Sequence, residues 1–504
     1  MTASSSSRYF GDNRSGAEHS QQSVQSGIFA IASRGIGAFV QIGSTIILAR
    51  LLSPEDFGLV SMVAAFTGFI PMLSDLGTRD AAVQRPTITE NEVSALFWLT
   101  VAIGTALGLL LALAGPLIAN YYHEPRLRDI ALASAAGFVV SAASCQHFAL
   151  LRRAMQFKAI ASIEVGSNLL SSLVAIAMAM YGAGYWSLVA KPVLLAAFTL
   201  IGVGSSCRWV PGIPKLTQGV RDMVKFGMHI TGFTMTDYVG RAVDRIAIGR
   251  RSGAAPLGYY QQSVFVYENV LGLLALSLHP VAVAGLSKLT DNMAEFKRSW
   301  SKAVATLAFF AMPAFGLLAV TAEDVVTLVL GEKWRFSAAL VAIMSLRGIP
   351  HCVERTLGWL HVPAGRGDRW MRWGLISTGV QVLALFCGLP FGVEGVVIAY
   401  VIVTYLLCIP AIAYAGHPLG IGAGDVVKAI HAPFIGTVLL VLAGFALDRT
   451  VLADVPGFVR VAGVTAAGAV IYFVVVVLVL RTREPLALAW RMARNFSGRR
   501  AADR

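Results

Sequence analysis

The stretch FGMHITGFTMTDYVGRAVDRIAIG, residues 226–249, places four charged side chains inside an otherwise apolar segment. Asp237, Arg241, Asp244 and Arg245 lie at positions i, i+4, i+7 and i+8, so an α-helix would carry all four on one face. A charge at bilayer depth costs about 2.5–3.5 kcal/mol on insertion scales, and such residues therefore face a bundle interior or a wet cavity. The segment predicts a membrane-spanning helix with one polar wall.

The composition of the whole chain also indicates that it lies in a lipid bilayer. Of its 504 residues, 56% are hydrophobic and 14% are charged, whereas about 25% of the residues of a soluble protein are charged. Apolar windows of about 18–25 residues recur, which is the length that crosses a hydrocarbon core. The chain is therefore expected to be an all-α polytopic membrane protein.

The N-terminal residues 1–26 are polar and lack the early apolar core of a signal peptide, so the first apolar helix is expected to be an uncleaved anchor. The five cysteines lie in or at the ends of apolar segments without metal-ligand spacing, which favours core positions over a metal site.

Windowed hydropathy predicts about 14 transmembrane spans. Their expected limits are 27–50, 57–76, 93–120, 130–150, 158–180, 185–206, 226–249, 257–286, 303–322, 337–361, 371–390, 393–415, 427–447 and 458–480.

The connections between these spans also predict the orientation of the chain. Most Lys and Arg residues fall on the side of the two termini, which places both termini in the cytoplasm under the positive-inside rule. The net charge of +13 is then largely topological and needs no nucleic acid to explain it. The basic C-terminal tail, with Leu486, Leu488 and Trp490 interleaved, is expected to contact anionic lipid rather than a partner protein.

Three pairs of stretches indicate an internal repeat. ARLLSPEDFGLV (49–60) resembles GRRSGAAPLGYY (249–260), with Gly58 and Gly258 at equivalent places. In the same order and at nearly the same spacing, EPRLRDIALA (124–133) matches EKWRFSAALV (332–341) and YGAGYWSLVA (181–190) matches FGVEGVVIAY (391–400). Since six spans per repeat is an even number, the repeats predict two six-helix lobes related by a pseudo-two-fold axis along the membrane normal.

The expected organisation follows from the spans and the repeat. It comprises a polar cytoplasmic tail (1–26), an N-lobe (27–206), a cytoplasmic linker (207–225), a C-lobe (226–416), two further C-terminal helices (417–480) and a basic cytoplasmic tail (481–504).

A second span repeats the charge pattern of the first stretch. In RGIPHCVER, residues 347–355, Arg347, His351, Glu354 and Arg355 again occupy i, i+4, i+7 and i+8. Two polar walls, one in each lobe, predict a shared chamber between them. Ionisable residues inside other spans include Arg34, Glu164, Lys191 and Glu268.

The predicted chamber carries more Arg and Lys than Asp and Glu, and this suits an anionic ligand, because guanidinium groups bind phosphate oxygens bidentately. An alternative stays open, in which pairs such as Asp237–Arg241 and Glu354–Arg355 are ion pairs that only hold helices together.

Common catalytic motifs are missing from the sequence. It contains no G-x-x-x-x-G-K-[ST] loop, no H-E-x-x-H and no Gly-x-Ser-x-Gly elbow. The predicted loops are too short to house a catalytic domain, so the function is expected to lie in the membrane and the protein is not expected to be an enzyme.

Several of these stretches resemble a known family. ILARLLSPEDFGLVSMVAAF (47–66) followed by SDLGTRDAAVQRPTITENEVSALFW (74–98) is similar to the start of Wzx-type polysaccharide flippases, members of the multidrug/oligosaccharidyl-lipid/polysaccharide (MOP) exporter superfamily, closest to the colanic-acid-type branch. AVDRIAIGRRSGAAPLGYYQQS (242–263) resembles the segment that opens the second lobe of that family, although Arg251 replaces the apolar residue usual there. ALLRRAMQFKAIASIE (149–164) and LGEKWRFSAALV (330–341) also resemble family stretches.

The resemblance implies a pair of lobes that works by alternating access and moves undecaprenyl-pyrophosphate-linked oligosaccharide repeat units across the bacterial inner membrane, for exopolysaccharide, O-antigen or capsule synthesis. It implies a cationic lumen and carries Arg34 and Arg245 into it, while the helix-face and charge arguments above add Lys191, Arg241, Arg347 and Arg355. Candidates for H⁺ or Na⁺ coupling are Glu164, Asp237, Asp244, Glu268 and Glu354, and no other cofactor is expected.

The expected partners are the lipid-linked oligosaccharide, anionic lipids and the polysaccharide polymerase or export machinery, and the transport unit is expected to be a monomer. Three rival functions stay open: a cation-coupled multidrug antiporter of the same superfamily, a membrane-embedded polysaccharide polymerase or ligase, and a non-transporting scaffold for a synthase.

Overall fold

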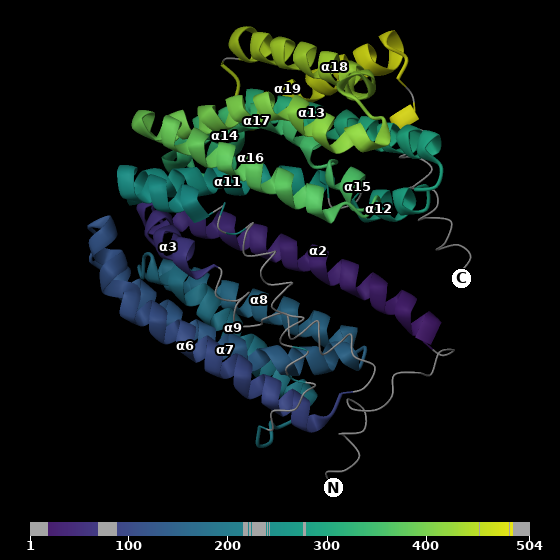
Figure 1. The fold of residues 1–504 in the computed structure, drawn as a ribbon. Helices are drawn as coiled ribbons and strands as arrows, with labels where there is room; N and C mark the ends of the chain where they lie inside the picture. Colours follow the sequence, from purple (N-terminus) through teal and green to yellow (C-terminus); the bar gives the residue numbers. More distant parts are fainter. Residues whose placement is uncertain are drawn as a thin grey trace. The chain divides into compact units, whose positions relative to one another are not determined.

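A computed structural model describes residues 19–68, 88–214, 220, 223, 238, 240, 242–275, 279–452, 454–482 and 484–486 of the chain. Throughout these residues the regular structure is helical (Figure 1), as the composition predicts. In chain order the helices are α2 (His19–Leu51), α3 (Pro54–Thr67), α6 (Glu90–Tyr122), α7 (Arg126–Arg153), α8 (Phe157–Met180), α9 (Trp186–Cys207), α11 (Ala254–Ala275), α12 (His279–Ser287), α13 (Met293–Leu330), η1 (Glu332–Trp334), α14 (Arg335–Glu354), α15 (Gly358–His361), α16 (Gly367–Gly388), η2 (Leu389–Phe391), α17 (Gly392–Gly416), η3 (His417–Leu419), α18 (Ala423–Thr450), α19 (Gly457–Phe473) and the π-helical η4 (Val474–Val479). A further helix covers residues 242–252.

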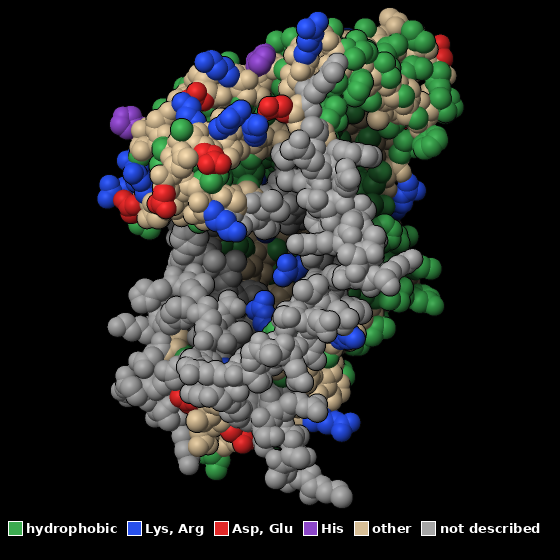
Figure 2. All heavy atoms as spheres, turned by 90° about the vertical axis from the view of Figure 1, so that its right-hand side faces the viewer, with side chains coloured by type: hydrophobic (Ala, Val, Ile, Leu, Met, Phe, Trp, Pro, Cys, Tyr) green, Lys and Arg blue, Asp and Glu red, His purple; other side chains and the backbone are tan. Residues whose placement is uncertain are grey.

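Within the described residues, nine helical segments are long and apolar enough to cross a membrane, and one of them, Gly367–Leu419, contains both α16 and α17. The expected spans at 57–76 and 226–249 fall partly or largely outside the described residues, so the count of about 14 stays a prediction. The protein is a multi-pass membrane protein, and large hydrophobic side chains such as Phe39, Leu113 and Leu117 are more than 70% exposed on its helices. Figure 2 shows charged side chains gathered at one end of the helices beside a flank of hydrophobic ones.

The described chain divides into two compact units, residues 1–258 and 259–504. The expected lobe bounds and the linker at 207–225 stay predictions, because residues 215–219 and most of 221–241 lie outside the described part.

In the first unit, α6 and α7 form a hairpin around His123, which adopts the left-handed conformation at φ 57°. α6 begins with a capping box in which Thr89 accepts from the Glu92 amide and Glu92 accepts from the Thr89 amide. Such a box satisfies backbone groups that a helix start leaves unpaired.

α2 and α8 pack side by side in the same direction, since Asn168 of α8 donates to Gly37 of α2 (3.4 Å) and, further along both helices, Ala175 packs against Leu48. α9 packs against α7 and α8. A core that includes Leu96, Leu150 and Val203 holds the same bundle together.

The ARLLSPEDFGLV stretch starts α3. Ser53 caps the helix together with Asp56, and Glu55 forms an ion pair with Arg126 at the start of α7. Gly58 faces the first turn of α11, and a Cβ there would lie 1.8 Å from the carbonyl oxygen of Ala254. The motif therefore sets a helix start and a close backbone contact.

In the second unit, α13 and α14 repeat the hairpin, with Gly331 at φ 107° in the turn. α13 extends well beyond the expected span at 303–322, because a hydropathy window detects only the apolar part of a helix that starts in the polar sequence MAEFKRSWSK. α17 packs against α14 and α16, over a core that includes Trp300 and Trp359.

Prolines inside two of these helices are each matched by a tyrosine from a neighbouring helix. Pro350 in α14 has no amide hydrogen to donate to the carbonyl of Leu346, and the Tyr405 hydroxyl of α17 donates to that oxygen at 3.0 Å. Pro313 in α13 likewise has no amide hydrogen to donate to the carbonyl of Phe309, and the Tyr472 hydroxyl of α19 donates to that oxygen at 2.8 Å. The second bond also fastens the last helices, α18 and α19, to α13.

Candidate functional site

The first unit presents a line of polar residues on α2. Gly37, Gln41 and Ser44 lie at helical spacing on one face of α2, and Arg34 lies about one turn before Gly37 on the same face. Lys191 of α9 donates from Nζ to Ser44 Oγ at 2.7 Å, and Ser44 Oγ donates to the carbonyl of Gln41 at 3.0 Å. We call Arg34, Gln41, Ser44, Glu164, Asn168 and Lys191 the first-unit polar strip.

Lys191 is half-buried between apolar helices and is held by a hydroxyl rather than a carboxylate. It forms no ion pair with any residue that the structure describes. A hydroxyl oxygen can accept from the ammonium group without neutralising it, so the positive charge stays available to an anion.

Arg34 and Glu164 are exposed and lie at about the same level of the parallel helices α2 and α8, because Glu164 precedes Asn168 by one turn and Arg34 precedes Gly37 by about one turn. They form no ion pair within 4 Å of each other. Arg34 is separated from Ser44 by ten residues, about 15 Å along the helix axis. The strip is therefore elongated.

The opening charge stretch is only partly described. Asp237 and Arg241 lie outside the described residues. Asp244 and Arg245 are half-buried on the helix at 242–252, and the charge of Arg245 acts on the hydroxyl of Tyr238. That hydroxyl donates to the carbonyl of Ala64 on α3 at 2.7 Å.

The second unit brings its predicted residues together. The hydroxyl of Tyr267 on α11 interacts electrostatically with four charged side chains, Glu268, Arg347, Glu354 and Arg355. The same hydroxyl lies 2.7 Å from Nδ1 of His351. The face predicted from the i, i+4, i+7, i+8 spacing thus lies beside one buried tyrosine, Tyr267. We call Tyr267, Glu268, Arg347, His351, Glu354, Arg355, Tyr400 and Thr404 the second-unit polar cluster.

Arg347 is the most firmly positioned cation of this cluster. Its Nε donates to Thr404 Oγ1 of α17 at 2.9 Å, and its guanidinium carbon lies 5.5 Å from the centroid of the Tyr400 ring. Arg347 is half-buried, and the described residues give it no ion pair within 4 Å. A planar guanidinium fixed at Nε by neutral partners keeps terminal N–H groups for a bidentate anion contact.

Arg355 is held differently, because its guanidinium lies 3.6 Å from a carboxylate oxygen of Glu268. Both side chains are about two-fifths exposed, so solvent screens this ion pair and it contributes little to the stability of the fold. The ion pair between Glu354 and Arg355, which the sequence left open as an alternative, is not the one found for Arg355. Glu354 is instead half-buried within the electrostatic reach of Arg347.

Charge patterns alone did not point to Ser44, Tyr267, Tyr400 or Thr404. These residues are uncharged, so a search for charges inside apolar segments cannot identify them. A signal for Thr404 exists only in its spacing, one helical turn after Tyr400.

Two solved structures share this fold. The chain resembles "Lipid II flippase MurJ, inward closed conformation" with a TM-score of 0.67 at 14% identity, over 89% of this chain and 99% of that one. It resembles an inward-facing multidrug resistance MATE family transporter of the MOP superfamily with a TM-score of 0.59 at 12% identity, over 78% and 98% of the two chains. The fold is that of a polytopic helical transporter.

A family described as polysaccharide biosynthesis protein matches residues 47–339, more than half of the chain, and the chain belongs to that family. Curated relatives include the teichuronic acid biosynthesis protein TuaB of Bacillus subtilis, 26% identical over 90% of this chain and 95% of its own length. The lipopolysaccharide biosynthesis protein WzxC of Escherichia coli is 23% identical over 80% and 82%. The succinoglycan biosynthesis transport protein ExoT of Rhizobium meliloti is 25% identical over 86% and 89%. The resemblance to Wzx-type flippases is thereby confirmed.

Proposed function

We propose that the protein is a flippase that moves undecaprenyl-pyrophosphate-linked oligosaccharide repeat units from the inner to the outer leaflet of the bacterial inner membrane by alternating access. Both termini would lie in the cytoplasm. The step makes and breaks no covalent bond, so no catalytic group or cofactor is required. Membership of the polysaccharide biosynthesis family and the MurJ-like fold support this function.

The observation that carries the proposal is the setting of Arg347. A half-buried guanidinium whose partners are a threonine hydroxyl and a tyrosine ring keeps its charge for a ligand. Lys191 repeats the arrangement in the first unit with Ser44. A pyrophosphate linked to sugars is an anion that such groups would hold in a low-dielectric setting.

A drug antiporter of the same superfamily would need the opposite preference, because organic cations are attracted to carboxylates and aromatic faces. Lys191 and Arg347 would repel such a substrate. We therefore place the multidrug function second.

Coupling is proposed for the carboxylates near these cations. Glu354 and Glu268 lie around Tyr267 with Arg347 and Arg355, so binding of an anion and of H⁺ or Na⁺ would affect each other electrostatically. In the first unit the same coupling role is proposed for Glu164, which lies at about the level of Arg34 on the neighbouring helix. The proposal assigns this role to Asp237 and Asp244 as well.

The test replaces Arg347 with Gln in cells that depend on this chain for surface polysaccharide. The matched control is Arg335→Gln on the same helix, because Arg335 is 70% exposed and is paired with Glu323 at the helix start. With equal membrane levels, Arg347→Gln should reduce export and leave lipid-linked precursor on the cytoplasmic leaflet, whereas Arg335→Gln should not.

Lys191→Gln should reproduce the effect of Arg347→Gln. Export at the control level in both variants would remove these cations from the mechanism. Loss of resistance to cationic drugs with unchanged polysaccharide would instead support the antiporter.

A further inference from the structure

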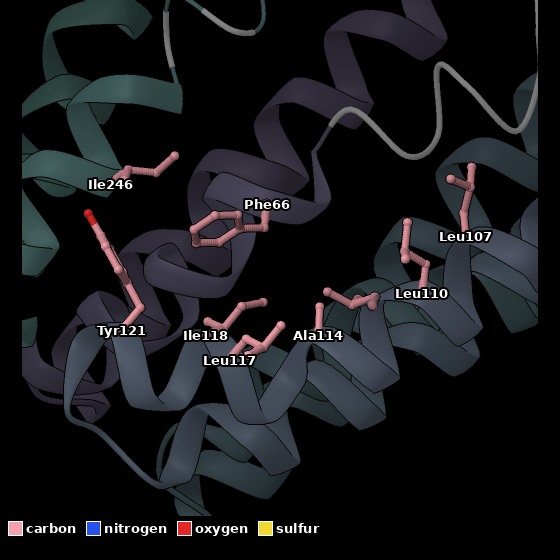
Figure 3. A pocket seen from close by; sticks show the side chains of 9 residues that line it. Phe66, Leu107, Leu110, Ala114, Leu117, Ile118, Tyr121 and Ile246 are labelled. Atoms are coloured by element: carbon pink, nitrogen blue, oxygen red, sulfur yellow. The ribbon is translucent and has the colours of Figure 1, made fainter.

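An apolar groove of about 480 Å³ lies within the first unit and shares no residue with the first-unit polar strip. Side chains of α6 from Leu107 to Tyr121 rise from one face of the helix into this space, with Phe66 of α3 and Ile246 of the helix at 242–252 across it (Figure 3). The lining of α6 runs from Leu107 to Tyr121, a rise of about 21 Å along the helix axis. The groove is therefore long enough for an extended hydrocarbon chain.

The lining is apolar throughout except for the hydroxyl of Tyr121. An apolar space of this kind is not stably filled by water, which needs polar partners. Leu110 and Leu117, which line it, are 61% and 72% exposed, so the groove opens at the surface of the bundle where lipid chains lie. Its occupant is therefore expected to be hydrocarbon.

One end of the groove carries positive charge. Arg250 lies one helical turn after Ile246, and its guanidinium carbon is 5.6 Å from the centroid of the Tyr121 ring. Arg250 and the adjacent Arg251 are exposed, and neither forms an ion pair within 4 Å with a residue of the described chain. On the predicted topology this end faces away from the cytoplasm.

We propose that the groove binds the part of the polyprenyl chain next to the headgroup of a polyprenyl-pyrophosphate lipid, with its pyrophosphate at Arg250. This inference rests on the proposed flippase function and assigns the groove to the lipid part of the substrate on the non-cytoplasmic side. The α6 lining is one helix face wide, which fits one chain, and the Arg250 guanidinium at its end can bind phosphate oxygens bidentately. A phospholipid would leave its second chain outside the groove.

The binding test uses the full-length protein in nanodiscs and a diazirine-bearing undecaprenyl pyrophosphate, with the labelled peptides mapped by mass spectrometry. Labelling is expected on α6 between Leu107 and Tyr121. Ala114→Trp should lower it about tenfold, because displacing two or more methylene groups from an apolar site has an effect of that size. Leu117→Trp provides a second blocking variant at a position that is 72% exposed and lies outside the buried core.

The matched control is Leu113→Trp, because Leu113 is next to Ala114 on α6, is 76% exposed and does not line the groove. It should label as the wild type does. Arg250→Gln should weaken labelling by the pyrophosphate probe and leave labelling by the corresponding diazirine-bearing polyprenol unchanged, since the alcohol carries no charge.

Equal labelling of the groove by a diazirine-bearing phosphatidylglycerol, or equal labelling of the Ala114→Trp and Leu113→Trp variants, would overturn the proposal. Because labelling needs no transport, its outcome is independent of the export assay. If the Ala114→Trp and Leu117→Trp variants export at the wild-type level and Arg347→Gln does not, the proposed role of the groove is refuted. The proposed flippase function is then unaffected.

Discussion

Gly58 and Gly258, which occupy equivalent places in the internal repeat, meet in a reciprocal contact within the first unit. A Cβ on Gly58 would lie 1.8 Å from the carbonyl oxygen of Ala254, and a Cβ on Gly258 would lie 1.8 Å from that of Pro54. Pro54 and Ala254 are themselves equivalent in the repeat. The two copies of one motif thus make the same backbone contact in both directions, and this explains why the repeat keeps glycine at these places.

Replacing either glycine with alanine should destabilise the protein. Overpacking costs about 1–3 kcal/mol, and a backbone oxygen cannot rotate away, so Gly58→Ala and Gly258→Ala should reach about 3 kcal/mol. Thermal unfolding of the purified protein measures the loss. Gly272→Ala on α11 and Gly43→Ala on α2 are the controls, because a Cβ at either place meets nothing within 4 Å. Stability equal to that of the controls would contradict the contact.

Thr404→Val should impair export because it removes the hydrogen bond that positions Arg347. The substitution keeps the shape of the side chain but removes the oxygen that accepts from Arg347 Nε at 2.9 Å. A hydrogen bond to a charged group is worth about 1.5–3 kcal/mol, so export should fall about tenfold. Thr437→Val on α18 removes a similar bond to the backbone, from a hydroxyl that donates to the carbonyl of Pro433, without touching a charge. If both variants export equally, Thr404 does not position Arg347.

Tyr472→Phe should loosen the last helices from α13. The Phe309 carbonyl, to which Pro313 cannot donate, would lose the Tyr472 hydroxyl, and a buried unsatisfied group costs about 1–3 kcal/mol. Adding Pro313→Ala restores an amide that can donate to the same carbonyl within the helix, so the double variant should recover part of that loss. A double-mutant cycle of unfolding free energies gives the comparison, and strict additivity of the two substitutions would exclude the compensation.

The pair Glu124–Arg126 predicts a pH-dependent contribution at the turn between α6 and α7. The hydrogen bond from Arg126 holds the pKa of Glu124 below its usual value of 4.5. A carboxylate with a lowered folded-state pKa stabilises the fold above its unfolded pKa, and this stabilisation is lost as the pH falls through the folded value. The two side chains are 23% and 42% exposed, so the effect at pH 7 should be about 1 kcal/mol.

Melting temperatures of the wild type and Glu124→Gln, measured from pH 7 downwards, should therefore converge as the carboxylate becomes protonated. Glu323→Gln removes a carboxylate that is 61% exposed and should change the melting temperature less at every pH. A gap between wild type and Glu124→Gln that widens on acidification would show that the sign is wrong.

Much of the second-unit polar cluster could be predicted from the sequence. The spacing of Arg347, His351, Glu354 and Arg355 on one helix defines a face, and the structure places all four around Tyr267. The shared face of these four residues can be predicted because helical periodicity is local and because charge inside an apolar run is conspicuous, while their role in binding stays a prediction.

The partners of the cations could not be predicted in this way. Ser44 lies 147 residues from Lys191, and Thr404 lies 57 residues from Arg347, so which hydroxyl meets which cation depends on how distant helices pack. The helix ends were also imprecise. Hydropathy detects the thickness of the bilayer, whereas α13 begins at Met293, well before its apolar part.

The tyrosines that donate to the carbonyls left without an amide partner by Pro350 and Pro313 have an evolutionary consequence. Pro350 makes the Tyr405 hydroxyl necessary, since otherwise the Leu346 carbonyl would face hydrocarbon without a donor. In a descendant that has lost the proline, the helix supplies that donor itself and the tyrosine is free to drift. Positions 350 and 405 should therefore change together across the lineage, and so should positions 313 and 472, although neither pair is adjacent in the chain.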